Sequence, residues 1–151
     1  MRSFDELFSM LCLFGGALTK YSMVDRHASD FGVGVKLFPS EIHMVTRVDS
    51  REGVGVTELA EESGITKGAV SQIVARLVDK GLLVKEPDPE NRARVVIRTT
   101  EKGRAASERH LKFHRNHDKV FLDYLSGLSD EEYALVREVG EQLNRWMDEY
   151  M

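Results

Sequence analysis

The strongest pattern of apolar and polar positions in the chain lies between Thr66 and Gly81. Its apolar residues recur three and four positions apart: Val70, Ile73, Val74, Leu77 and Val78. This spacing predicts an amphipathic helix with one buried stripe. Thr66 can accept a backbone N–H bond at the helix start, and Gly81 is suited to end the helix. The opposite face carries mostly short or hydrogen-bonding side chains: Lys67, Gly68, Ser71, Gln72, Ala75 and Arg76.

A shorter helix and a hairpin flank this segment. A helix capped by Thr57 and ended by Gly64 precedes it, and residues 82–86 and 95–99 are short β-like runs. The residues between these runs, 87–94, include two prolines, an asparagine and two arginines. The pattern predicts a helix-turn-helix followed by a basic hairpin wing, an arrangement that places one helix in a DNA groove. The bland alternative is an amphipathic hairpin of helices whose polar face only meets water.

Outside this segment the pattern is helical. Helices are expected from Phe4 to about Arg26, from Pro39 onward, from Thr100 to about Leu125, and after a capping box at Ser129. The predicted fold is mainly α with a small β-hairpin wing: a winged helix-turn-helix domain with N- and C-terminal dimerisation helices.

The terminal helices carry more apolar surface than a small winged-helix core can cover. We therefore expect residues 1–28 and 105–151 to pack against a second subunit, and residues 40–104 to form the winged-helix DNA-binding lobe of a single domain, 1–151. A monomer with extra helices is the alternative. The run around Cys12 is apolar, which favours a buried, inert thiol.

The net charge of −4 by itself argues against binding to nucleic acid, but the charges are unevenly distributed along the chain. Residues 66–104 hold nine Lys and Arg against five Asp and Glu, whereas residues 1–65 and 105–151 each hold six against ten. Positive charge is thus concentrated on the proposed reading unit, which favours binding to double-stranded DNA. There is no run of 18 apolar residues and no signal-peptide pattern at the start, so we expect a cytoplasmic location.

Three of the five histidines lie close together on the long helix, at positions 110, 114 and 117. At helical spacing they share a stripe with apolar residues and should point inward. A pair spaced i and i+4 can direct two ring nitrogens at one metal ion, but a hydrogen-bonded polar core is the commoner arrangement.

The run LAEESGITKGAVSQIVARLVDKGLLVKEPDPENR, continued by TTEKGR, resembles the MarR family of winged helix-turn-helix regulators. The resemblance extends weakly over nearly the whole chain. It implies a homodimer, most simply a repressor, with a recognition helix in the major groove and a wing near the minor groove. The family's wing usually has Asp-x-Arg, where this chain has Asn91-Arg92-Ala93 with Arg94 one place later.

The residues expected nearest DNA follow from the helix face and the wing. On the recognition helix they are Thr66, Lys67, Ser71, Gln72 and Arg76. Gln72 is the best candidate for reading a base edge, while the two cations suit phosphates. In the wing, Arg92 and Arg94 stand in for the displaced arginine of the family.

One branch of the MarR family consists of zinc-responsive repressors with a site of three histidines and a carboxylate. The resemblance lays that site on Asp25, His43, His110 and His114, a set that suits a tetrahedral Zn²⁺ and is acceptable to other divalent metals. The branch's second site includes a cysteine where this chain has Phe31, which argues against a second metal here. His117 and Asp118 are an alternative ligand and an orienting partner.

Three alternatives remain. In the first, an organic ligand bound between the wing domain and the dimer helices releases a MarR-type repressor. In the second, the same histidines and Asp25 hold a catalytic ion in a metal-dependent enzyme, although the sequence offers no convincing general base. In the third, the winged helix is a protein-interaction module, which the charge of residues 66–104 disfavours. We expect the chain not to be an enzyme.

Overall fold

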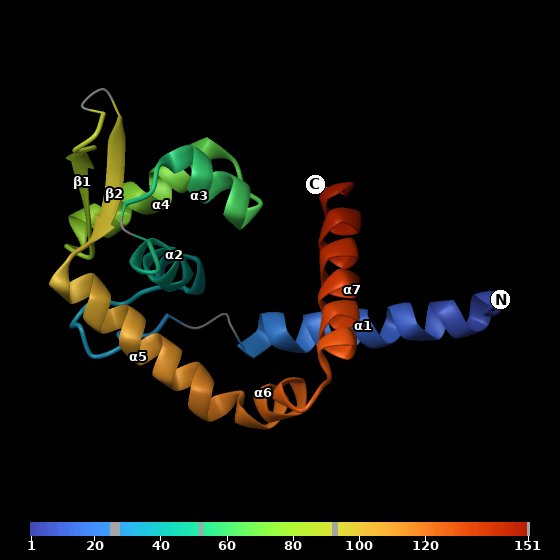
Figure 1. Cartoon of the computed structure of the whole chain (residues 1–151). Helices are drawn as coiled ribbons and strands as arrows, with labels where there is room; N and C mark the ends of the chain where they lie inside the picture. Colours follow the sequence, from blue (N-terminus) through green and yellow to red (C-terminus); the bar gives the residue numbers. More distant parts are fainter. Residues whose placement is uncertain (25–27, 52, 92–93, 151) are drawn as a thin grey trace. The chain divides into compact units, whose positions relative to one another are not determined.

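The computed structural model describes residues 1–24, 28–51, 53–91 and 94–150. Within them the chain forms seven α-helices and one antiparallel hairpin (Figure 1), as expected for a mainly α fold. The elements are α1 (Phe4–Val24), α2 (Pro39–Asp49), α3 (Val56–Ser63), α4 (Lys67–Asp79), β1 (Leu83–Pro87), β2 (Val95–Thr99), α5 (Glu101–His117), α6 (Lys119–Ser126) and α7 (Asp130–Asp148). Two compact units are present, Met1–His110 and Leu111–Met151, and their boundary falls inside the continuous helix α5. In these residues no helix is both long and apolar enough to span a bilayer.

Several helix ends lie where the sequence predicts them. The Thr66 hydroxyl accepts a hydrogen bond from the Ala69 N–H at 3.2 Å, which caps α4. Gly81 follows α4 with a φ of 73°, a left-handed conformation that glycine adopts without strain. Ser129 and Glu132 form the expected reciprocal capping box at the start of α7, with bonds of 3.3 and 2.9 Å.

Two predicted boundaries are wrong. Helix α3 is capped at Gly55 rather than Thr57, because the Glu58 carboxylate accepts the Gly55 N–H at 2.7 Å. The helix that follows the hairpin is also interrupted: α5 ends at His117, and α6 begins after Asp118, whose ψ of 9° departs from helical geometry.

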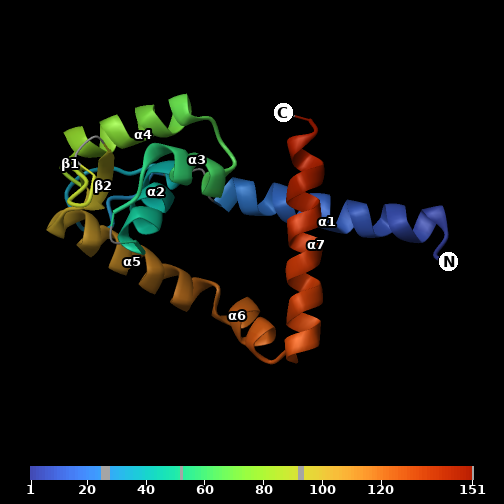
Figure 2. The same cartoon turned by 45° about the horizontal axis from the view of Figure 1, so that its top comes forward.

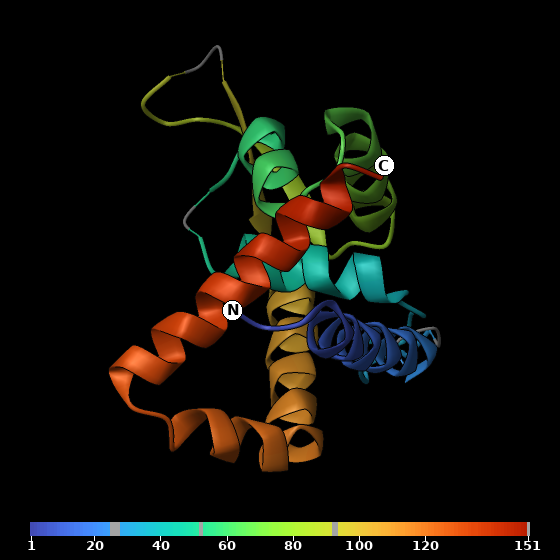
Figure 3. The same ribbon diagram turned by 90° about the vertical axis from the view of Figure 1, so that its right-hand side faces the viewer.

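The hydrophobic core of the first unit lies between α2, α3, α4 and the hairpin, which Figures 1 and 2 show gathered together. Its fully buried side chains include Val45, Val48, Leu59, Val70, Val74, Leu77 and Leu82. β1 pairs with β2 from Leu83 opposite Thr99 to Pro87 opposite Val95, and Val54 adds an isolated bridge to Ile97. Helix α5 follows directly on β2 (Figure 3). The apolar stripe of α4 is therefore held from three sides, and its polar face is turned out.

Gly103 marks a close approach between α5 and the segment before β1. A Cβ at this position would clash with the backbone carbonyl oxygen of Leu82, which no side-chain rotation can relieve. We expect Gly103→Ala to lower the free energy of unfolding by about 3 kcal/mol. The matched control is Gly140→Ala in α7, where a Cβ meets nothing within 4 Å and where we expect a gain of up to about 1 kcal/mol from helix propensity. Urea unfolding followed by circular dichroism measures both, and equal effects would contradict the packing argument.

The remaining helices expose apolar surface. On α1 the exposed side chains include Phe4, Leu7, Phe8 and Leu13, with 53–76% of their surface accessible. No described residue of α6 or α7 is buried in the single chain. Cys12 is exposed on α1, so the prediction of a buried thiol is wrong for the isolated chain. The neighbouring apolar side chains Met10, Leu11 and Leu13 are exposed as well.

Candidate DNA-binding face and histidine cluster

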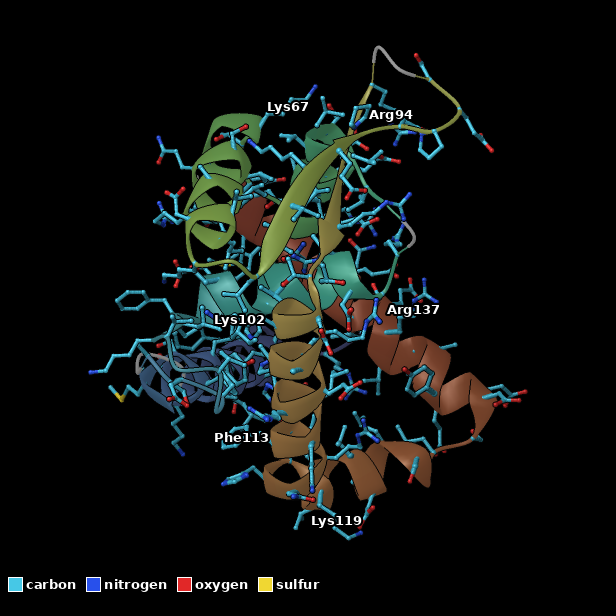
Figure 4. All side chains as sticks on the ribbon, turned by 90° about the vertical axis from the view of Figure 1, so that its left-hand side faces the viewer. Lys67, Arg94, Lys102, Phe113, Lys119 and Arg137 are labelled. Atoms are coloured by element: carbon cyan, nitrogen blue, oxygen red, sulfur yellow. The ribbon has the colours of Figure 1, made fainter. Side chains whose placement is uncertain are left out.

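The outer face of α4 begins with four exposed residues that a ligand can approach closely. Lys67, Gly68, Ser71 and Gln72 are all exposed, and Thr66 before them is exposed while it caps the helix. The start of the helix thus offers one cation, two hydrogen-bonding side chains and a glycine without a Cβ. Figure 4 shows Lys67 at the same end of this lobe as Arg94 of the hairpin.

Arg76, further along α4, is engaged by a buried carboxylate. Glu41 of α2 has 2% of its surface exposed. Its carboxylate accepts a hydrogen bond from Lys80 at 2.6 Å and lies 3.6 Å from the Arg76 Nε. Burial favours the neutral acid, but the hydrogen bonds from Lys80 and the Phe38 N–H, with the charges of Lys80 and Arg76, outweigh it and lower the pKa of Glu41 below 4.5. The α4 cations thus also fasten the helix to α2.

This buried carboxylate makes the stability depend on pH. Because the folded-state pKa of Glu41 is lowered, its contribution is present above about pH 4.5 and is lost as the pH falls through the folded-state pKa. We expect Glu41→Gln to lower the free energy of unfolding at neutral pH by about 1–3 kcal/mol and to cost progressively less below pH 4. Urea unfolding across this range tests it, with the exposed Glu138→Gln as control. A loss that stays constant with pH would contradict the prediction.

In the wing, Arg94 lies in an ion-pair network. Its guanidinium contacts Glu58 of α3 at 2.5 Å and Asp88 of the hairpin loop at 3.5 Å. Hydrogen bonds from the Gly55 N–H and from Arg94 lower the pKa of Glu58. The wing is therefore tied to the first turn of α3. Arg92, the other predicted wing residue, lies outside the described residues.

The ion pairs divide the cations of residues 66–104 into two groups. Arg98 pairs with Glu86, and Arg104 with Asp49, in addition to the pairs of Arg76, Lys80 and Arg94. Among the described cations of this segment, Lys67, Lys85 and Lys102 make no ion pair, and Lys102 instead donates to the Lys80 carbonyl oxygen at 2.9 Å. Lys67 is thus the cation of the α4 face whose charge has no carboxylate beside it.

The histidine cluster joins α2 to α5. His43, His110 and His114 each offer a ring nitrogen, and these atoms all lie within 4.8 Å of one another. His43 comes from α2, while the other two lie one turn apart on the continuous helix α5. The rings of His43 and His110 are 5.1 Å apart between centroids, and His110 is buried. Asp25, the predicted carboxylate ligand, lies outside the described residues.

The surroundings of the cluster include partners that sequence spacing does not reveal. Thr46 Oγ1 lies 3.2 Å from Nδ1 of His110. The ring of Phe31 meets the His110 ring edge-on at 5.4 Å. Arg109 donates to the carbonyl oxygens of Phe31 and Gly32, which fixes the connection before α2 against α5. These contacts depend on how the connection folds back, so the sequence pattern alone does not show them.

His117 does not join the cluster, and the prediction that it points inward is wrong. It is exposed, its ring stacks on Phe113 at 3.9 Å, and its Nδ1 contacts the Phe113 carbonyl oxygen at 3.2 Å. His114 is half-buried and lies 2.6 Å from Asp118 through Nδ1.

Three imidazole nitrogens at this spacing are chemically suited to a metal ion. A tetrahedral zinc ion with bonds of about 2.0 Å holds its ligand atoms about 3.3 Å apart, so the three ring nitrogens, which lie within 4.8 Å of one another, would move closer to bind one ion. Two of the imidazoles already have a hydrogen-bonded second nitrogen, which is the usual support of a metal-binding histidine. The residues therefore fit a divalent metal that prefers nitrogen ligands.

Comparison with known proteins agrees with the fold and the motif order. The profile of the MarR family matches residues 39–94. The uncharacterized HTH-type transcriptional regulator YhjH of Bacillus subtilis is 27% identical over 118 residues, which cover 78% of this chain and 67% of that protein.

Two solved structures share the fold. Streptococcus pneumoniae FabT in complex with DNA superposes with a TM-score of 0.64 at 20% identity and covers 99% of this chain and 100% of its own. The zinc-responsive MarR family member ZitR of Lactococcus lactis gives 0.63 at 18% identity, with 93% and 99% covered. The winged-helix segment of the chain is therefore similar to that of MarR-family transcriptional regulators, and the chain shares the fold of the solved structures FabT and ZitR.

Proposed function

We propose that this protein is a sequence-specific DNA-binding repressor that acts as a homodimer and responds to zinc. The observation that carries the DNA-binding part is the exposed start of α4, which is capped, free of bulky side chains and opposite a fully buried stripe. A helix presented in this way fits the major groove of B-DNA. Because its target in this role is the chromosome, we place the protein in the cytoplasm. The similarity to transcriptional regulators favours this function over that of a metal-dependent enzyme.

The residues of α4 make different kinds of contact with the DNA in this proposal. Gln72 has the amide geometry to donate to and accept from an adenine edge. Lys67 contacts a phosphate, and Ser71 and Thr66 add hydrogen bonds. Arg76 contributes positive potential from a position where it also pairs with Glu41. FabT, a structural neighbour, is known in complex with DNA, which supports the same use of this fold here.

The wing contributes positive charge while it is held in place. An arginine has five N–H donors, and the carboxylates beside Arg94 lie at its Nη1 and Nη2 atoms. Arg94 therefore retains donors for a phosphate after it has anchored the hairpin. Arg92 supplies a second wing contact in this proposal.

The exposed helices supply the dimer interface. Apolar side chains of α1 such as Phe4 and Leu13, and those of α6 and α7 such as Val120, Phe121 and Leu135, are 60–85% exposed in the single chain. Three amphipathic helices without buried residues of their own are a surface that a second copy can cover. A dimer presents two α4 helices to successive turns of the DNA.

The zinc response rests on His43, His110 and His114, with Asp25 as the fourth ligand. A bound ion supplies a cross-link between α2 and α5, and it can act on DNA binding only through a difference in affinity between two arrangements of the dimer. Arg109, with its guanidinium on the carbonyl oxygens of Phe31 and Gly32, places a positive charge beside the cluster and disfavours a second metal there. The zinc-responsive neighbour ZitR supports the proposal.

Fluorescence anisotropy tests both parts of the function. Chelator-stripped protein is titrated onto labelled DNA from upstream of its own gene and onto random DNA, with and without zinc. Zinc-dependent tightening on the specific DNA is the expected result. Specific binding of the same affinity with and without zinc would contradict the metal response and favour an organic effector. Equal binding to both DNAs would contradict the role of α4 in recognising the DNA sequence.

A further inference from the structure

Both histidines that α5 brings to the cluster are held through the same ring nitrogen. Nδ1 of His114 lies 2.6 Å from the Asp118 carboxylate, and Nδ1 of His110 lies 3.2 Å from the Thr46 hydroxyl. The two partners come from different elements, Thr46 from the middle of α2 and Asp118 from the break between α5 and α6. The rings are also braced, because Phe31 meets His110 edge-on and Phe113 meets His114 edge-on at 5.6 Å.

The chemistry of these partners selects one tautomer. An ionised carboxylate accepts hydrogen bonds and donates none, so the bond to Asp118 places the hydrogen of neutral His114 on Nδ1 and its lone pair on Nε2. The Thr46 hydroxyl is able to accept the same kind of bond from Nδ1 of His110. Each ring would then present Nε2 as the atom that can bind a metal.

The placement of Asp118 is not explained by helix capping. It is the residue before α6, a position where aspartate usually caps the helix with its carboxylate, but its side chain makes no capping bond. The neighbouring Lys119 pairs with Asp123 at 2.5 Å. The carboxylate is instead directed one turn back to His114, where its charge strengthens an imidazole as a metal ligand.

We propose that Asp118 and Thr46 are positioning residues of the metal site, which preset His114 and His110 to bind the ion through Nε2. The inference rests on the proposed zinc response and adds two residues that touch no metal themselves. It also accounts for the side chain of Asp118, which bonds to His114 one turn back although its position before α6 would allow it to cap that helix.

The test compares two carboxylates of the same kind. Asp118→Ala removes the partner of His114, and Asp123→Ala removes the carboxylate of the adjacent i,i+4 pair with Lys119. We expect zinc affinity, measured by competition with a chromophoric chelator, to fall about 10- to 100-fold in the first variant and to stay unchanged in the second. Asp118→Asn, whose amide oxygen still accepts, should lose less. Thr46→Val should weaken zinc binding in the same direction as Asp118→Ala.

A second readout does not require metal. In nitrogen-15 NMR spectra of the metal-free protein, His114 and His110 should appear as Nδ1–H tautomers, and Asp118→Ala should remove this preference at His114 only. An Nε2–H tautomer at His114 in the wild type, or equal zinc affinities of the two alanine variants, would overturn the inference. A wild-type protein that takes up no zinc would instead overturn the proposed metal response, and the NMR spectra would still decide the tautomer.

Discussion

Replacing His110 and His114 together by alanine is expected to lower zinc affinity more than about 100-fold, beyond the loss typical of an outer-sphere partner. The two residues supply two of the three imidazole nitrogens that lie within 4.8 Å of one another. A zinc ion left with His43 and Asp25 would have to complete its coordination with water. In the anisotropy experiment, the double variant should bind the specific DNA equally with and without zinc.

The matched control for this variant is His117→Ala. His117 lies on the same helix but stacks on Phe113 outside the cluster, so its loss should leave zinc affinity unchanged. Because His110 is buried, its replacement can disturb the fold. The single variant His114→Ala, at a half-buried position, avoids this problem and should already show most of the loss of zinc affinity. Unchanged zinc uptake in both His114→Ala and the double variant would contradict the proposed site.

The second large effect is expected at Gln72. Removing its amide in Gln72→Ala should reduce the preference for the specific DNA over random DNA about 5- to 150-fold, which corresponds to about 1–3 kcal/mol for one bidentate base contact. The side chain is exposed on α4, so the fold should be unaffected. Anisotropy on both DNAs measures the ratio of the two affinities. Equal losses on both would contradict a base-reading role.

Lys67→Ala gives the complementary pattern on the same helix face. Its ammonium is expected to contact a phosphate, so its loss should weaken both DNAs alike and reduce the slope of log affinity against log salt by about one. Comparing the two variants thus separates the recognition of the DNA sequence from the electrostatic attraction to any DNA. If Lys67→Ala lowered the affinity for the specific DNA alone, Lys67 would be a base-contacting residue rather than a phosphate-binding cation.

The local part of the fold was predictable because its signals are local. Thr66, Gly81 and Ser129 act within three or four residues of themselves, and the structure confirms each of them. The hairpin follows from two short β-like runs with prolines between them. The start of α3 was misplaced although its signal is local too: Glu58 lies three residues after Gly55 and accepts its N–H, a bond that replaces a capping hydroxyl at Thr57.

The partners of the charged residues were not predictable, because they depend on the tertiary arrangement. Glu41 is buried against Lys80 and Arg76, which lie 39 and 35 positions away along the chain. Arg94 meets Glu58 across 36 positions. Likewise, nothing in the run around Asp118 breaks a helix as proline does, so the interruption of α5 appears only in the structure. The site residues remain predictions that the proposed experiments test.

The bond between Arg94 and Glu58 has a consequence for how the proposed DNA binding can be regulated. It fastens the hairpin to α3, which itself packs on α4, while Glu41 fastens α4 to α2. These contacts link the hairpin to α4 through α3, so we expect the two DNA-facing parts of a lobe, the hairpin and α4, to move together. An effector then has little freedom to reshape one lobe. In the proposed dimer, we expect an effector to change the distance between the two lobes, so that its effect on DNA binding depends on the spacing of the operator half-sites.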